Sequence, residues 1–446
     1  MLKRKIDAIF NEWKSRKNHK PLIVKGSRQT GKTTSIREFG KTYKSFVEIN
    51  FKENPEFKEC FVNFDPVDIV KSISIKNPGF CFVPHDTLIL FDEIQDFPNA
   101  ITSFKFFHEQ GLYDIIASGS LLGISYNKIS SIPVGFKEEI EMKSLDFEEF
   151  LWARGYDNNF IEDVYNSLKN FKELNKITFN RLDSLYKEYI YLGGMPEVVN
   201  SFILNMNYNE PLSIQHRIYK DYEDDIIKYV EGLDVARVKN IYRSLSLQLA
   251  KDNHKFQISK ISHGAKSRDY LGCYEWLVDA GIINACYNLS EIKTPFELYR
   301  KDGYYRLYYA DHGLFMTSLD KEDRAQIVNN NDFNIYNGAL YESLVSEALD
   351  KQGYRLFFYK NESATIELDF LIRKENIIIP LEVKRTRGRS VSLKSCIDNP
   401  DVDINIGIKL THQNIGYNDG FITIPYFLSF LLKRFLSEID LNKIKA

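Results

Sequence analysis

Short apolar runs alternate with longer amphipathic stretches through the first 150 residues. The runs at 22–25, 46–51, 87–93 and 114–120 predict strands, and the third ends in two carboxylates. Helices are predicted between them, at 32–43 and 100–109. Strands that alternate with helices indicate an α/β domain.

The middle of the chain has helical periodicity, from residue 151 to about 225, with a sharp break at Gly193-Gly194-Met195-Pro196. Beyond it, a winged-helix-like pattern of three helices followed by short strands is expected. The helices are predicted at 237–250, 259–265 and 267–281, and the strands at 282–287, 296–300 and 305–309.

The last part of the chain returns to a mixed pattern after the polar stretch 329–332, which is typical of a linker. A helix is predicted at 340–351, a strand at 355–359, and a hairpin of strands 367–372 and 377–384. We therefore expect four domains, at 1–150, 151–230, 231–325 and 332–446.

Composition narrows the class of protein. The chain has 446 residues, 27% charged and 43% hydrophobic, with a formal net charge of −2. No apolar run approaches the roughly 20 residues that cross a bilayer, and no secretory signal is predicted. Five cysteines without a C-x-x-C pair favour a reducing cytoplasm over a disulfide framework or a zinc site.

The most specific motif is Gly26-Ser27-Arg28-Gln29-Thr30-Gly31-Lys32-Thr33, followed by Thr34. A strand precedes it and a helix follows it, which is the setting in which G-x-x-x-x-G-K-[ST] cradles phosphates. Lys32 is expected to reach the β and γ phosphates, and Thr33 to hold Mg²⁺. The helix start at Lys32 adds its positive dipole end. The motif predicts a nucleoside triphosphate site.

The carboxylates of the third strand are the expected partners of this loop. Asp92 is predicted to share Mg²⁺ with Thr33, and Glu93 to polarise the attacking water as a general base. A hydroxyl at the end of the fourth strand can align that water. Ser118 and Ser120 both qualify, and the sequence does not choose between them.

A second group of charged residues lies in the last domain. Glu382 and Lys384 share one face of a strand, and Asp369 on the adjoining strand and Glu342 from the helix can converge with them. Such a set suits Mg²⁺ beside an attacking water. The pattern resembles the PD-(D/E)xK nuclease core, and a basic segment at 384–389, with Lys394, would suit a phosphate backbone.

Several segments together resemble a family of bacterial and archaeal AAA+ ATP-binding proteins. They are residues 20–33, 90–95, 118–120, 145–150, 191–197, 253–256, 307–314, 366–372 and 381–384. The resemblance implies an AAA-type P-loop domain and a carboxyl-terminal domain of unknown function with a restriction-endonuclease-like core. It also implies ATP, rather than another nucleotide, together with Mg²⁺.

One position departs from that family. Where its members usually carry arginine after Pro-Val-Gly, this chain has Phe136, followed by Lys137. An arginine there can act on the transferring phosphoryl group, and phenylalanine cannot. Three alternatives follow: either Lys137 takes the place of that arginine, or an arginine of another copy acts in trans, or hydrolysis is slow.

Two functions follow as hypotheses. The first is an oligomeric ATPase that engages DNA through the winged-helix and nuclease-like domains, with the winged-helix cations including Lys255, Arg300, Lys301 and Arg306. The second is a nucleotide-gated switch with an inactive nuclease-like domain. The partners expected are ATP, further copies of the chain and DNA, without a membrane.

Overall fold

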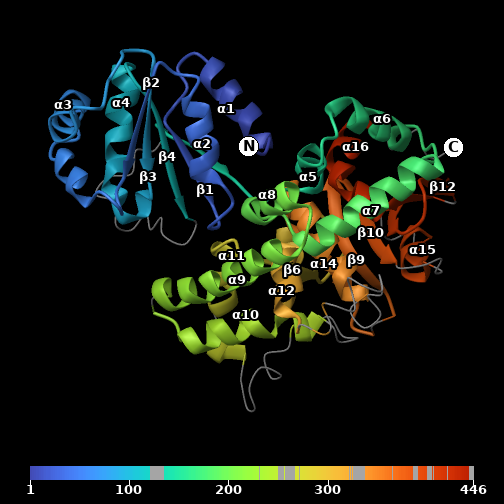
Figure 1. Ribbon diagram of the computed structural model, residues 1–446. Coiled ribbons are helices and arrows are strands. Elements are labelled where there is room, and N and C mark those ends of the chain that lie inside the picture. The colour runs from blue at the N-terminus through green and yellow to red at the C-terminus, as the bar shows by residue number, and fades with distance from the viewer. Residues whose placement is uncertain are drawn as a thin grey trace. The chain divides into compact units, whose positions relative to one another are not determined.

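The computed structural model describes residues 1–120, 135–230, 232–249, 256, 267–270, 272–320, 322, 324, 337–363, 365–384, 390–398, 404, 406–418 and 420–440. The chain divides into two units (Figure 1). One contains residues 1–144 with 279–281, and the other contains 145–278 with 282–446.

The amino-terminal unit is built on a five-stranded sheet with the order β2-β3-β4-β1-β5, in which all neighbouring strands are parallel. Its strands are β1 (Leu22–Gly26), β2 (Ser45–Asn50), β3 (Thr87–Asp92), β4 (Asp114–Ser120) and β5 (Glu138–Glu141). Parallel pairing places all the carboxyl ends at one edge. Gly26 pairs with Ser120 there, and Asn50 pairs with Asp92.

Helices cover both faces of this sheet (Figure 1), which explains why its strands are apolar on both sides. The longer helices are α1 (Lys5–Ser15), α2 (Lys32–Gly40), α3 (Pro66–Lys76) and α4 (Phe104–Gln110), with short 3-10 turns at Pro55–Cys60, Ile94–Asp96 and Pro98–Ser103. Along β3 the side chains alternate between two cores. Leu88 and Leu90 pack with α1 and α2, and Ile89 and Phe91 pack with α3 and α4.

Unit two begins with consecutive helices, as the periodicity predicts. They are α5 (Phe147–Ala153), α6 (Asn158–Lys169), α7 (Lys176–Leu192), α8 (Pro196–Asn205), α9 (Asn209–Tyr229), α10 (Val235–Leu249) and α11 (Cys273–Asp279), with a 3-10 turn at Ser267–Tyr270. The helix predicted at 259–265 lies outside the described residues.

An eight-stranded sheet with the order β12-β13-β11-β10-β9-β8-β6-β7 forms the rest of unit two. Its strands are β6 (Ile283–Leu289), β7 (Arg300–Tyr309), β8 (Leu356–Lys360), β9 (Glu367–Lys374), β10 (Ile377–Lys384), β11 (Gly407–Thr411), β12 (Gly416–Asn418) and β13 (Phe421–Pro425). The helices that accompany it are α12 (His312–Ser318), α14 (Asn337–Lys351), α15 (Val391–Ile397) and α16 (Leu432–Glu438), with 3-10 turns at Phe296–Tyr299 and Tyr426–Leu431.

This sheet crosses the boundary that we expected between 231–325 and 332–446. Strand β6 pairs in parallel with β8, with Cys286 opposite Leu356 and Leu289 opposite Tyr359. The strands predicted at 282–287 and 305–309 in the winged-helix-like pattern correspond to β6 and to the second half of β7, which lie at one end of the eight-stranded sheet. The strand predicted at 296–300 is also wrong in most of its length, because residues 296–299 form a 3-10 turn.

The Gly193-Gly194 break has a packing explanation. A Cβ on Gly194 would lie 2.1 Å from the carbonyl oxygen of Leu145, so no other residue fits there. The backbone N–H of Gly194 donates to Asp311 (2.9 Å), and its carbonyl accepts from the N–H of Leu145 (2.7 Å). The turn thus binds the start of unit two to the loop before α12.

Buried charges surround the same place. Glu347 contacts the ring of His312 and the amine of Lys351, which also donates to the carbonyl of Leu145 (2.8 Å). Burial raises the pKa of Glu347, but the charges of His312 and Lys351 outweigh that effect and lower it to about 2. These charges neutralise one another inside the protein.

Among the described helices, none is both long and apolar enough to cross a membrane.

Candidate functional site

The glycine-rich loop lies between the end of β1 and the start of α2, at the carboxyl edge of the five-stranded sheet. Gly31 precedes the helix with φ of 91°, a conformation that favours glycine. Lys32 is the first residue of α2. The N–H groups of the first helical turn therefore start at the loop, as anion binding requires.

The amine of Lys32 donates to two carbonyls of its own loop, those of Gly26 (3.0 Å) and Ser27 (2.8 Å). Burial lowers the pKa of Lys32 to about 8, although the charges of Glu93 and Asp92 act in the opposite direction. A lysine desolvated in this way gains a charge partner when phosphate oxygens replace the carbonyls.

Asp92 is almost fully buried, and neutral side chains donate hydrogen bonds to its carboxylate. Oδ1 accepts from the hydroxyls of Thr33 (3.1 Å) and Ser118, and Oδ2 accepts from the amide of Asn50 (3.2 Å). These donors orient the carboxylate without neutralising its charge. Asp92 and Thr33 are thus a donor pair that fits a hard divalent cation such as Mg²⁺.

Glu93 follows directly, in a left-handed backbone conformation with φ of 51°. The amide of Gln95 donates to Glu93 Oε2 and accepts from the backbone N–H of Ser120 (3.3 Å). Gln95 therefore joins the carboxylate to the end of β4. Of the two candidate serines, Ser118 is bonded to Asp92, whereas the buried hydroxyl of Ser120 has no partner among the described residues.

Three contributors were not anticipated. Asn50 and Gln95 are polar residues at or just after strand ends, a signal that the sequence does offer. Arg4 is less visible, because it is one of three consecutive basic residues at the amino end of the chain, Lys3-Arg4-Lys5. Its guanidinium is buried and donates to the carbonyls of Thr30 (2.8 Å) and Lys143 (2.7 Å). Arg4 therefore connects the phosphate loop to the segment that follows β5.

The departure at Phe136 has a geometric consequence. Glu138 pairs with Leu22, so Lys137 lies level with Pro21, at the amino edge of the sheet. The glycine loop begins five residues further along β1, a distance of about 16 Å. Lys137 contacts Glu139, and the Phe136 ring packs against His108 (5.8 Å between centroids). Lys137 therefore does not replace the missing arginine within its own unit.

The residues of the nuclease-like pattern are brought close together in unit two, but around another cation. Asp369 accepts from the N–H of Val383 (2.8 Å), and Lys384 contacts Glu382 (3.0 Å). The guanidinium of Arg306, from β7, lies 3.1 Å from Glu342 and 3.8 Å from Asp369.

The expected Mg²⁺ does not fit this arrangement. Within the ranges that the structure describes, no three His, Cys, Asp or Glu side chains are placed to hold a metal ion. Burial and the charge of Glu342 raise the pKa of Asp369 to about 7, against the opposing charge of Arg306.

The cations proposed for DNA contact are also placed differently from expectation. Arg306 is only 2% exposed and cannot reach a phosphate backbone. Arg300 stacks on Tyr287 (3.7 Å to the ring centroid), and Lys301 lies 3.5 Å from Glu362. Residues 385–389 and Lys255 lie outside the described residues, whereas Lys394 is exposed on α15.

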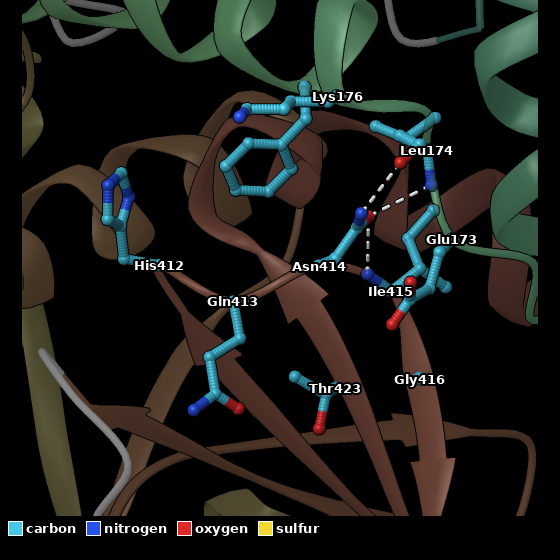
Figure 2. A pocket seen from close by; sticks show the side chains of 10 residues that line it. Glu173, Leu174, Lys176, His412, Gln413, Asn414, Ile415, Gly416 and Thr423 are labelled. Carbon is cyan, nitrogen blue, oxygen red and sulfur yellow. Dashed lines mark hydrogen bonds between the residues drawn. The ribbon is translucent and has the colours of Figure 1, made fainter.

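A polar pocket of about 620 Å³ opens beside the amino end of α7 (Figure 2). Its central side chain, Asn414, accepts from the N–H groups of Leu174 (2.9 Å) and Ile415 (2.9 Å) and donates to the carbonyl of Leu174 (2.7 Å). The amide therefore holds the loop after β11 against the start of α7. The residues that line this pocket do not include Glu342, Asp369 or Glu382, nor any other candidate residue of the sequence analysis.

Comparisons with known proteins match three separate stretches of the chain. Residues 18–151 match a family profile described as an AAA domain, and residues 183–325 and 337–427 match two profiles described only as domains of unknown function. Among curated proteins, none matches the chain.

Solved structures align over much of the chain, but loosely. The Walker-type ATPase of Pyrococcus abyssi aligns at 12% identity over 71% of this chain and 96% of its own, with a TM-score of 0.43. DnaA of Aquifex aeolicus, bound to AMPPCP, aligns at 14% identity over 61% and 86%, with a TM-score of 0.28. These scores are too low to define a common overall fold. The profile match and the geometry of the loop identify the amino-terminal unit as an AAA domain of the P-loop type.

Proposed function

We propose that the amino-terminal unit binds ATP with Mg²⁺ and hydrolyses it. One observation carries the proposal: Lys32, Thr33, Asp92 and Glu93 meet at the carboxyl edge of one parallel sheet, with Asp92 held by neutral donors. Ligands of open α/β sheets bind at this edge. The choice of ATP rests on the AAA domain match.

Each residue has a separate task in this proposal. Thr33 and Asp92 hold the cation, which neutralises phosphate charge when it is bound. Lys32 exchanges its bonds to the loop carbonyls for bonds to phosphate oxygens. Glu93 accepts a proton from the attacking water, and Gln95 orients its carboxylate. Ser120, whose buried hydroxyl has no partner among the described residues, is the residue we assign to alignment of the water.

Steady-state ATP hydrolysis by wild type and Glu93→Gln tests this function. We expect the variant to bind ATP with wild-type affinity and to lose about 10²- to 10⁴-fold in kcat, because only the proton acceptor is removed. Asp96→Asn is the matched control, since this exposed carboxylate lies in the same turn. Equal loss in both variants would contradict the role of Glu93.

We further propose that the active form is a homo-oligomer in which another copy supplies an arginine. The position of Lys137 at the opposite sheet edge supports this, since Lys137 contacts Glu139 and lies level with Pro21, away from the loop. Specific activity should then rise with protein concentration. Activity independent of dilution over a hundredfold range would contradict it and favour slow hydrolysis by the monomer.

Action on DNA remains the hypothesis for unit two, with a nucleotide-gated switch as the second candidate. The burial of Arg306 among carboxylates favours the switch. A buried Arg306 cannot contact DNA, and it lies where the DNA hypothesis requires a catalytic metal. Binding to duplex DNA as a function of salt separates the two. A steep fall of affinity with salt supports DNA contact, and weak binding at every salt concentration supports the switch.

A further inference from the structure

The carboxylate cluster of unit two contains its own cation. Arg306 is buried on β7, and its guanidinium reaches carboxylates from two other elements. Nη1 lies 3.1 Å from Glu342 on α14 and 3.8 Å from Asp369 on β9, and Nη2 bonds to Glu367. One side chain thus ties an outer strand to the centre of the sheet.

The surroundings of Arg306 are arranged for a guanidinium. The ring of Phe358 lies 4.3 Å from its central carbon, a cation–π contact on one planar face. Tyr308 donates its hydroxyl to the same Glu342 oxygen that Arg306 contacts (3.1 Å). A spherical, hydrated ion would satisfy neither the planar contact nor the fork of bonds.

Lysines contact the other two carboxylates, although Glu382 Oε2 is buried and has no hydrogen-bond partner among the described residues. Lys360 lies 2.6 Å from Glu367, and Lys384 lies 3.0 Å from Glu382. Three cations therefore face the four carboxylates, Glu342, Glu367, Asp369 and Glu382. A divalent ion would add two positive charges to a group that is already close to neutral.

We propose that Arg306 is the resident cation of this cluster, occupying the place between Glu342 and Asp369 that the sequence assigns to Mg²⁺. The cluster then locks β7 to the β9–β10 hairpin, and it does not cleave phosphodiesters. This proposal is independent of ATP hydrolysis in the other unit.

Titration of the nucleotide-free full chain with Mn²⁺ is the direct test. The Asp92→Asn variant removes the ion site of the AAA domain, so any remaining binding reports on other sites. We expect no stoichiometric Mn²⁺ binding by this protein and no nicking of supercoiled plasmid. Mn²⁺ binding that disappears on adding Asp369→Asn, or nicking that disappears with Glu382→Gln, would overturn the proposal.

A second measurement asks whether Arg306 acts as the lock. Arg306→Met should lower the Tm of unit two by on the order of 10 °C, because it leaves buried carboxylates uncompensated. Arg300→Met is the control, since this arginine is on the same strand but stacks on Tyr287 at the surface. A loss no larger than that of the control would contradict the lock. If Arg306→Met does not fold, the Mn²⁺ titration, which leaves Arg306 intact, decides alone.

Discussion

The two acidic sites of this protein contain similar residues but differ in what compensates their charge. At the AAA domain, Asp92 is oriented by two hydroxyls and an amide, all of them neutral. In unit two, Glu342 and Asp369 lie around the guanidinium of Arg306. Neutral donors preserve a carboxylate for an exchangeable ion, whereas a built-in cation replaces that ion. A carboxylate motif is therefore weak evidence for a metal where a buried cation contacts its carboxylates directly.

Removal of divalent ions should produce the largest difference between the two acidic sites. With EDTA we expect ATP hydrolysis to fall by about 10²-fold or more, because the phosphate charge loses its counter-ion. The thermal unfolding of unit two should not change. Differential scanning calorimetry of the nucleotide-free protein checks the second part. A lowered Tm for unit two on chelation would mean that its cluster holds a metal after all.

Substitution of the two serines of β4 should separate orientation of the ion ligand from alignment of water. Ser120→Ala is expected to lower kcat by roughly 10²-fold with little change in the Mg²⁺ requirement. Ser118→Ala should instead raise the Mg²⁺ concentration needed for half-maximal activity by several-fold, because Asp92 loses a donor. Mg²⁺ titrations of activity for both variants measure this, and identical behaviour would refute the division of roles.

The affinity for ATP should depend on pH through Lys32. Its pKa of about 8 in the free protein means that it is charged below pH 8 and has to take up a proton on binding above it. We expect about tenfold weaker binding at pH 9 than at pH 7. Isothermal titration at pH 8.5 in buffers of different ionisation enthalpy should detect the proton uptake. In Lys32→Arg the pH dependence should vanish, and an equal dependence in both proteins would exclude Lys32 as its source.

The smallest effect is expected at Lys137. Its partner is Glu139, and it lies at the sheet edge away from the loop, so Lys137→Ala should change kcat by less than about twofold. A residue that stabilises the transferring phosphoryl group would be worth about 10³-fold or more. A loss of that size would show that Lys137 does reach the nucleotide, for example from a neighbouring copy.

The phosphate loop and its strands were predictable because their signals are local. Eight consecutive residues define the loop, and four of the five strands of the AAA domain were predicted from their apolar residues. The fifth strand, β5, was not predicted, because Glu138–Glu141 contains a single apolar side chain. The strand expected at 296–300 was wrong for a local reason as well. Phe296 and Tyr299 face the same core at a spacing of three residues, which is the period of a 3-10 turn.

The position of Arg306 among the carboxylates of unit two could not be predicted in the same way. Arg306 and its partners are 36 to 63 positions apart in the chain (342 − 306 and 369 − 306), on different elements. The apolar neighbours of Arg306 in Tyr304–Tyr309 indicate burial, but they do not identify its carboxylate partners. Only the order of strands in the sheet brings it under α14.

The pairing of β6 with β8 also has a consequence for folding during synthesis on the ribosome. About 70 residues separate the two strands, and at ~5–20 residues per second the ribosome needs several seconds to deliver β8 after β6. During that time β6 has an unsatisfied backbone edge, open to pairing with another nascent chain. An expression fragment that stops near residue 330 would make this temporary state permanent. We therefore expect such fragments to aggregate, and fragments cut at residue 144 to remain monodisperse.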